Sequence, residues 1–568
     1  MMKRLAGSAC SSSSSSNSTK ELKVAIIGAG ACGLVAARVL DRSPVGISSV
    51  TVLERDDRCG GIWNYIRKRK PNSSTNKCSS SSMTSSHEDN TVDGRMYRPM
   101  YRGLRTNLPA TIMAYREFPW VDDDHPQPTE ETRTEEGQSS FVTHDQILKY
   151  LNHYAQTFDL HRLIRYNCSV QRLAIVENDD TRHNTATTTS SSSSTELLPR
   201  IELTWKDTTT EVQVSQIFDA VLICNGHYAK PFTPHIDGME EYFKGHIMHS
   251  IQFDDPSIFL NKTVVCVGGG PSGSDLAREI SKFAKHVYLS ISNYTDMMSN
   301  NNNNNNSTRC FLDHASVSPN NNGLFTCDNV TLVPSTVRVD SDSTVLFQSN
   351  ANDIYKVLNP DVLIFCTGYE YDFPFLNNGS TSSSSSSSSS NNLIHQARGK
   401  SVSPLYQQLW HARYPNIAFL GLPFSVLPFP LFELQAEAVV SQLLNCAAIP
   451  LPPLRERLRI IAEEDSQCSG QPPQDGITTN TRIKDTHYLG KHQWNYCRNM
   501  AEISGTYNSH MMKYLTMNQA IYEHSASYRL QSFPGGPDTY RNMRYIRNDQ
   551  EQKFTVISGQ VTQVVSIQ

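Results

Sequence analysis

The chain has 568 residues, a net charge of −4 and 19% charged side chains, and its basic residues are scattered. This balance argues against a nucleic-acid-binding surface, and no apolar run reaches the about 18 residues of a membrane span. The 13 cysteines form no CxxC pair and several lie in apolar runs, which predicts buried thiols in a reducing, cytoplasmic setting.

Five homopolymeric tracts interrupt the sequence. Polar repeats of this kind cannot bury enough apolar surface to offset the entropy of ordering them. We therefore expect these tracts, together with residues 1–19, to be disordered segments that emerge from surface loops or ends. The tracts are Ser11–Ser16, Ser79–Ser82, Ser190–Ser194, Asn300–Asn306 and Ser382–Ser390.

A glycine-rich turn near the N-terminus predicts a first dinucleotide site. The apolar run Leu22–Ile27 is typical of a buried parallel strand, and the residues after the turn have helical periodicity. In the GxGxxG motif between them, the first glycine permits a tight turn, the second lets the backbone approach a pyrophosphate, and the third lets helix and strand pack closely. The N–H groups of the helix N-terminus would bind the phosphates. The cofactor-binding residues predicted here are Gly28, Gly30, Ala31, Cys32 and Gly33.

An acidic residue at the end of the next strand supports this prediction. The run Ser49–Leu53 is followed by Glu54, about 20 residues after the motif. A carboxylate at this position can accept hydrogen bonds from an adenosine ribose. The sequence ERDDRCGGIWNY follows, and its paired glycines could let backbone approach the same ligand. The arrangement resembles the FAD-binding start of flavoproteins with two dinucleotides, and it implies that Gly61, Ile62 and Trp63 bind the cofactor. Ordinary core packing is the alternative for Trp63.

A second motif of the same kind lies about 240 residues further along the chain. The apolar run Thr263–Val267 precedes it, and a helix and another strand follow, which predicts a second βαβ unit. A nicotinamide nucleotide with a 2′-phosphate needs a cation near the end of that last strand. Lys285 and Arg309 are candidates, so the preference for NADPH over NADH stays open. The residues assigned to this nucleotide are Gly268, Gly270, Ser272, Gly273, Ser274 and Asp275.

The order of these units predicts an α/β protein with two doubly wound, Rossmann-like domains, the second inserted in a discontinuous first. The run Phe218–Tyr228 is expected to leave the FAD domain. The run Asp361–Leu376, which contains Thr367 and Gly368, is expected to return and close against the flavin. The expected segments are 20–225 and 355–510 for the FAD domain, 226–354 for the NADP domain, and 511–568 for a C-terminal extension without assigned chemistry.

The segment before the second glycine motif carries a family fingerprint. FKGHIMHSIQF places Phe243, Gly245, His249 and Phe253 in the spacing FxGxxxHxxx(F/Y). Together with the two glycine motifs, it resembles the flavin-containing monooxygenases over roughly residues 22–290 and 355–505. The related Baeyer–Villiger enzymes, an alternative, usually end this fingerprint in Trp. The fingerprint histidine is expected to hold the link between the domains rather than to act as a base.

The stretch YRGLRTNLPATIMAYREFPW is similar to the family segment that carries an active-site asparagine. The matching residue is Asn107, preceded by Thr106, and the resemblance makes Asn107 the catalytic candidate. Its amide could donate hydrogen bonds to oxygen activated on the flavin and to the nicotinamide, whereas capping a turn before Pro109 is the alternative. Val170 and Gln435 complete the predicted cofactor-binding set, although Gln435 could equally lie on the surface.

The resemblance also implies a reaction. NADPH would reduce FAD, the reduced flavin would form a C4a-hydroperoxyflavin with O₂, and this would oxygenate a small molecule at a nucleophilic nitrogen or sulfur. A disulfide oxidoreductase is an alternative, but Cys59 has no partner at CxxC or CxxxxC spacing. A flavoprotein that acts as a binding scaffold or NADPH oxidase is another. No metal-ligand spacing is found, and a homodimer stays open.

Overall fold

The structure is a computed structural model that describes most of the chain. The described residues are 21–43, 45–68, 91–92, 95–121, 139–176, 198–292, 294, 317–319, 324–349, 354–376, 393–397, 399–468, 486–532, 534, 536 and 538–567. Residues 1–19 and the five homopolymeric tracts, for which we predict disorder, lie outside the described residues.

The first domain is built on a sheet with the strand order β24-β25-β26-β9-β1-β2-β5. Its parallel part consists of β26 (Ile417–Phe419), β9 (Ala220–Ile223), β1 (Leu22–Ile27), β2 (Ile47–Leu53) and β5 (Ile164–Arg165). The antiparallel strands β25 (Trp410–His411) and β24 (Leu405–Tyr406) extend one edge. Val24, Ala25 and Ile26 in β1 are fully buried because both faces of the sheet are covered.

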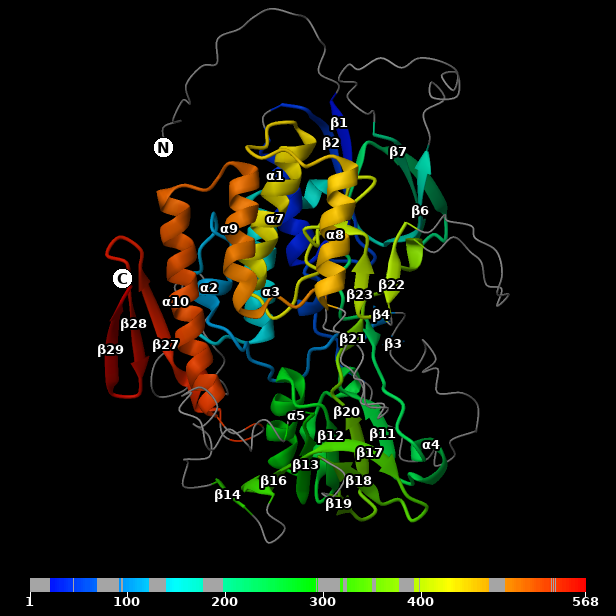
Figure 1. Ribbon diagram of the computed structural model, residues 1–568, viewed down its shortest axis with the longest axis vertical. Helices are drawn as coiled ribbons and strands as arrows, with labels where there is room; N and C mark the ends of the chain where they lie inside the picture. The colour runs from blue at the N-terminus through cyan, green and yellow to red at the C-terminus, as the bar shows by residue number, and fades with distance from the viewer. Residues whose placement is uncertain are drawn as a thin grey trace, which may run out of the picture.

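Helices cover one face of this sheet (Figure 1). Helix α1 (Ala31–Asp41) packs on α7 (Pro428–Leu443), α7 on α9 (Gln493–Ser504), and α9 on α10 (Ser509–Gln531). Apolar side chains of β1 on the other face pack with those of a small sheet, formed by β6 (Cys168–Val176), β7 (Arg200–Asp207) and β8 (Gln213–Phe218). The remaining helices of this domain are α2 (Ala110–Met113), α3 (His144–Thr157) and α8 (Leu454–Cys468).

The second domain has a seven-stranded sheet of its own, with the order β11-β20-β12-β13-β16-β15-β14. The strands are β11 (His246–His249), β20 (Val362–Phe365), β12 (Thr263–Val267), β13 (His286–Ser290), β16 (Val330–Val333), β15 (Phe325–Cys327) and β14 (Val317–Pro319). Helix α5 (Pro271–Ser281) connects β12 to β13, and this βαβ unit is the one that the sequence predicts. A separate antiparallel sheet is formed by β17 (Ser335–Val339), β18 (Val345–Gln348) and β19 (Ile354–Val357).

The chain crosses between the domains along a two-stranded ribbon, in which β10 (Lys230–Pro231) pairs antiparallel with β21 (Tyr369–Glu370). The predicted boundary at residue 355 is wrong, because β19 and β20 belong to sheets of the second domain. The run that was expected to return to the flavin therefore first completes the nucleotide-domain sheet, and the crossing comes after Cys366. A buried apolar strand can pair with either sheet, so its sequence alone does not choose between them.

The C-terminal extension is folded against the first domain. Strands β27 (Arg544–Asn548), β28 (Lys553–Ser558) and β29 (Val561–Ser566) form an antiparallel sheet, and Phe554 and Tyr545 are buried in the main core. The other short elements are α4 (Met239–Tyr242), β3 (Thr91–Val92), β4 (Arg95–Met96), β22 (His395–Ala397) and β23 (Ser401–Ser403). Among the described residues, none of the helices is both long enough and apolar enough to cross a membrane.

Candidate active site

Both glycine motifs have the same tight geometry between strand and helix. Gly28 has a φ of 100°, and a Cβ built on it would lie 2.7 Å from the carbonyl oxygen of Cys224. In the second motif, Gly268 has a φ of 111°, and its Cβ would lie 2.6 Å from the carbonyl oxygen of Cys366. Only glycine satisfies both the positive φ and the close approach of backbone from the neighbouring strand.

The middle glycines of the two motifs differ in what they face. A Cβ on Gly30 would lie 3.5 Å from the Cα of Gly61, and a Cβ on Gly61 would lie 2.9 Å from the Cα of Gly30. The two loops therefore pack backbone against backbone, which explains the paired glycines after the second strand. A Cβ on Gly270 would meet none of the described residues within 4 Å, so among them the N-terminus of α5 faces open space.

Glu54 lies at the carboxyl end of β2, beside the first glycine loop, and is only 7% exposed. Its Oε2 accepts a hydrogen bond of 2.6 Å from the N–H of Ala29, and its Oε1 accepts one of 2.9 Å from Asp56. Burial raises the pKa of this carboxyl, although both hydrogen bonds oppose that shift. Each oxygen keeps a second lone pair, and the role of this side chain at a ribose stays a prediction.

The residues after Glu54 close around the same loop. Gly60 donates its N–H to the carbonyl of Ala29 at 2.9 Å, and Ile62 and Trp63 are half-buried in the turn that follows. The Trp63 ring packs edge-on against Phe429, with ring centroids 6.4 Å apart. The packing expected under the alternative for Trp63 is therefore present, and its role in cofactor binding stays a prediction.

Asn107 follows a segment whose backbone is held firmly. Thr106 is buried, its N–H donates to the carbonyl of Val142 at 2.8 Å, and its Oγ1 accepts from the N–H of Val142 at 3.1 Å. The side-chain amide of the half-buried Asn107 makes no hydrogen bond with any described residue. Helix α2 begins after Pro109 without a side-chain cap from the described residues, so the capping alternative has no support.

Three predicted cofactor residues have structural partners. Gln435 is fully buried in α7, accepts from the N–H of Gly421 at 2.9 Å and donates to the hydroxyl of Tyr496 at 2.8 Å. The surface alternative for Gln435 is therefore wrong. The Oγ1 of Thr367 donates to the carbonyl of Phe232, and the carbonyl of Gly368 accepts from the N–H of Phe232 at 2.9 Å. Thr367 and Gly368 thus brace the crossing ribbon.

Ala31, Cys32, Val170, Ser272 and Ser274 complete the predicted set. Ala31 and Cys32 are buried at the start of α1, and Ser272 and Ser274 lie in the first turn of α5. Val170 lies in β6, which reaches the end of β2 through a hydrogen bond of 2.7 Å from the N–H of Cys168 to the carbonyl of Glu54. Four of these residues therefore lie in the helices that follow the two glycine loops. Val170 lies in the neighbouring strand β6, two residues beyond this hydrogen bond.

The fingerprint residues connect the two domains. Burial lowers the pKa of His249 to about 4, so the ring is neutral. Its Nε2 donates to the carbonyl of Gly368 at 3.1 Å, and its Nδ1 accepts from the N–H of Ile251 at 3.2 Å. The carbonyl of Phe253 accepts from the buried ammonium of Lys68 at 2.6 Å. These contacts support the predicted linking role of His249 and leave it no basic nitrogen for catalysis.

Asp275 has a different environment from the one predicted. Its carboxylate accepts hydrogen bonds from Arg278 at 3.0 Å and from Arg541 at 2.9 Å. Arg541 is not predictable from the sequence, because a single arginine in an extension without motifs gives no local signal. Cys59 faces the amide of Asn152 and forms no disulfide, so the structure gives no support to a disulfide oxidoreductase.

Two sheets with parallel centres, in which a glycine loop follows the carboxyl end of β1 or β12 and leads into the N-terminus of α1 or α5, define a protein with two dinucleotide-binding domains. Glu54 beside the first loop fits one dinucleotide, and the open loop at Gly270 fits the other. A family model described as flavin-binding monooxygenase-like matches residues 21–313, and the chain belongs to this family.

Curated relatives and solved structures agree with this assignment. The flavin-containing monooxygenase FMO GS-OX-like 4 of Arabidopsis thaliana is 30% identical over 83% of this chain and 85% of its own length. FMO GS-OX5 of the same plant is 29% identical, over 88% and 89% of the two chains. The S-allyl-L-cysteine S-oxygenase from Allium sativum has a TM-score of 0.64 at 25% identity and covers 92% of this chain and 95% of its own. Tmm from Pelagibacter sp. strain HTCC7211, with a TM-score of 0.60 at 20% identity, covers 96% of each chain and shares the fold.

The protein is therefore a flavin-dependent monooxygenase that uses FAD and NADPH. When bound, the flavin supplies the reduction and activation of O₂, which protein side chains cannot carry out by themselves. The two glycine loops with Glu54 and the N-terminus of α5 are the parts of the chain that would hold the two dinucleotides. The predictions of family, fold class, reaction type and cofactors are confirmed by these findings.

Proposed function

We propose that this monooxygenase oxygenates the sulfur of small thioethers, with nitrogen of tertiary amines as a second class of substrate. The reaction balances as thioether, O₂, NADPH and a proton giving sulfoxide, NADP⁺ and water. The preference for sulfur is supported by the similarity to the Allium sativum S-oxygenase over nearly the whole length of both chains. A soft nucleophile needs no enzymic base, which agrees with a His249 whose two ring nitrogens are both engaged in hydrogen bonds.

FAD is assigned to the first glycine loop with Glu54, and NADPH to the second loop at the N-terminus of α5. The observation that carries the catalytic proposal is the side-chain amide of Asn107, which has no hydrogen-bond partner among the described residues although the backbone before it is fixed. An amide held in this way can donate to oxygen bound at the flavin without a cost of reorganisation.

The test compares S-allyl-L-cysteine with its ether analogue O-allyl-L-serine. With the thioether we expect faster NADPH oxidation, formation of sulfoxide and less hydrogen peroxide, whereas the ether should change none of these. The Asn107→Ala variant should keep its FAD and release peroxide in place of nearly all of the sulfoxide, since a lost oxyanion donor commonly costs about two orders of magnitude. An unchanged sulfoxide yield in this variant would refute the role of Asn107. Equal stimulation by both substrates would refute the preference for sulfur.

Two further predictions belong here. A cytoplasmic location is supported by the described cysteines, none of which forms a disulfide. A homodimer is compatible with the sequence and is decided by sedimentation velocity of the purified protein.

A further inference from the structure

The C-terminal extension reaches the segment that carries Asn107. The N–H of Tyr545 donates to Ser140 Oγ at 2.8 Å, and the N–H of Ser140 donates to the carbonyl of Met543 at 3.2 Å. Ser140 in turn accepts from the N–H of Ala110, at the start of α2, at 2.7 Å. The extension therefore lies directly behind the Thr106–Asn107 segment, although more than 400 residues of sequence separate them.

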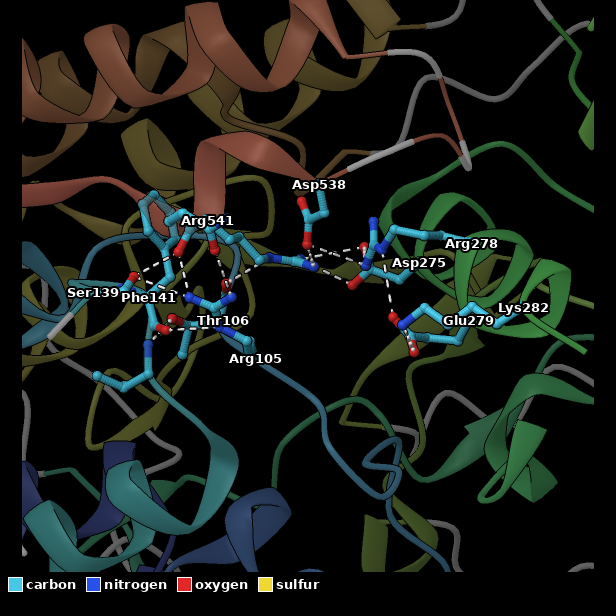
Figure 2. A network of polar contacts seen from close by, with 12 residues as sticks. Arg105, Thr106, Ser139, Phe141, Asp275, Arg278, Glu279, Lys282, Asp538 and Arg541 are labelled. Atoms are coloured by element: carbon cyan, nitrogen blue, oxygen red, sulfur yellow. Dashed lines mark hydrogen bonds and ion pairs between the residues drawn. The ribbon is translucent and has the colours of Figure 1, made fainter. Parts of the chain in front are cut away.

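Arg541 connects three parts of the chain through its guanidinium group. Its Nε donates to the carbonyl of Thr106 at 2.8 Å, its Nη1 to Asp538 at 2.8 Å and its Nη2 to Asp275 at 2.9 Å. Figure 2 shows this side chain between the segment of Thr106 and the helix that carries Asp275. The Nε of Arg541 thus binds the first domain, its Nη1 binds the extension and its Nη2 binds the nucleotide domain.

The site is a nearly neutral group of charges in which Arg541 is buried and its partners are partly buried. The Arg541 side chain is 2% exposed, and Arg278 approaches both Asp275 and Asp538, at 3.0 Å and 3.5 Å. Two arginines therefore balance two carboxylates, and the neighbouring carboxylates raise the pKa of Arg541 against its burial. The planar guanidinium group of an arginine has donors in fixed directions and can bind three acceptors at once. The ammonium of a lysine is a point charge that cannot reproduce this geometry.

The main chain of the same residue fixes the other side of the segment. The carbonyl of Arg541 accepts from Arg105, the residue before Thr106, and from the hydroxyl of Ser139 at 2.5 Å. Arg105 also donates from its Nε to the carbonyl of Phe141 at 3.1 Å. Arg541 is therefore bonded to both residues that precede Asn107, one through its side chain and one through its backbone.

We propose that Arg541 is a positioning residue that holds Asn107 in place relative to α5, whose N-terminus is assigned to NADPH. The C-terminal extension then contributes to the active site, because it couples the position of the Asn107 amide to the nucleotide domain. The carboxylate of Asp275 serves this contact instead of a direct contact with NADPH. The proposal rests on the proposed role of Asn107, and it adds to that role the element that sets its geometry.

The test uses Arg541→Lys, which keeps the charge and removes the fork, and Asp275→Asn. The exposed Lys553, paired with Glu551 in the same extension, gives the control variant Lys553→Gln. In the protein without nucleotide or substrate, hydrogen exchange should become about tenfold faster in peptides covering both 104–108 and 271–281 in Arg541→Lys, and remain parental in Lys553→Gln. This readout does not depend on activity.

In the FAD-loaded enzyme, Arg541→Lys should release about tenfold more peroxide per NADPH consumed, since small misplacements near the reacting atoms are costly. The same substitution in an Asn107→Ala background should add little peroxide, because the group that it positions is gone. Faster exchange confined to residues 538–567, or full additivity with Asn107→Ala, would overturn the proposal. If Asn107→Ala alone left coupling intact while Arg541→Lys disrupted it, the role of Asn107 would fail and Arg541 would act on the domain contact alone.

Discussion

Gly270→Val offers a clean separation of nucleotide binding from folding. Gly270 precedes α5 with a φ of −69° and a ψ of −175°, a backbone conformation open to any residue. Its Cβ would lie more than 4 Å from every neighbour in the described part of the chain, so the added side chain fills the space in front of the helix. We expect the fold to lose at most about 1 kcal/mol, the cost of an unfavourable residue before a helix.

The effect on nucleotide binding should be much larger. A valine in this space would keep a pyrophosphate from the first-turn N–H groups, and each hydrogen bond to a charged group is worth about 1.5–3 kcal/mol. Losing two such bonds costs about 3–6 kcal/mol, which raises the Kd for NADP⁺ about 10²- to 10⁴-fold. The flavin content should stay parental, because the first loop is untouched.

Titration of the flavin fluorescence with NADP⁺ measures the Kd, the flavin absorbance per protein measures FAD content, and thermal unfolding measures the fold. Gly273→Ala is the contrasting variant, because its Cβ would lie 1.8 Å from the carbonyl oxygen of Gly268 and should unfold the second domain. A Kd for Gly270→Val within about threefold of the parental value would refute the assignment of the pyrophosphate to this loop.

Two further predictions concern the first domain. Gly33→Ala would place a Cβ 1.9 Å from the carbonyl oxygen of Gly28 and should abolish the yield of folded yellow protein. Gly30→Ala would place its Cβ 3.5 Å from the nearest atom and should fold. Equal yields of the two variants would contradict the close packing at Gly33. Burial raises the pKa of Glu433 to about 7, above the about 4.3 of an unfolded chain, so the parental protein should lose stability on the order of 3 kcal/mol as the pH rises through this window. Glu433→Gln should remove that loss in urea unfolding at about pH 5 and pH 8, and an unchanged pH dependence would show that this carboxyl is not its source.

Much of the site could be read from the sequence because its parts are local. A GxGxxG motif, the strand before it and the acidic residue after the next strand lie within about 30 residues, so one βαβ unit contains both the pattern and its reason. The glycines are required by contacts made within that unit or with the adjacent strand, such as that of Gly28 with Cys224. The family fingerprint adds the link between domains, and the neutral His249 agrees with it.

Other features were decided only by the tertiary structure. The sheet that β20 joins, the buried position of Gln435 and the ion pair of Asp275 each depend on partners far away in the sequence. Arg541 is the clearest case, since the carbonyl that it holds is 435 residues away in the chain. The sequence determined two nucleotide loops through local sterics and periodicity, whereas the way in which they are held around Asn107 depends on long-range polar contacts that no local pattern encodes.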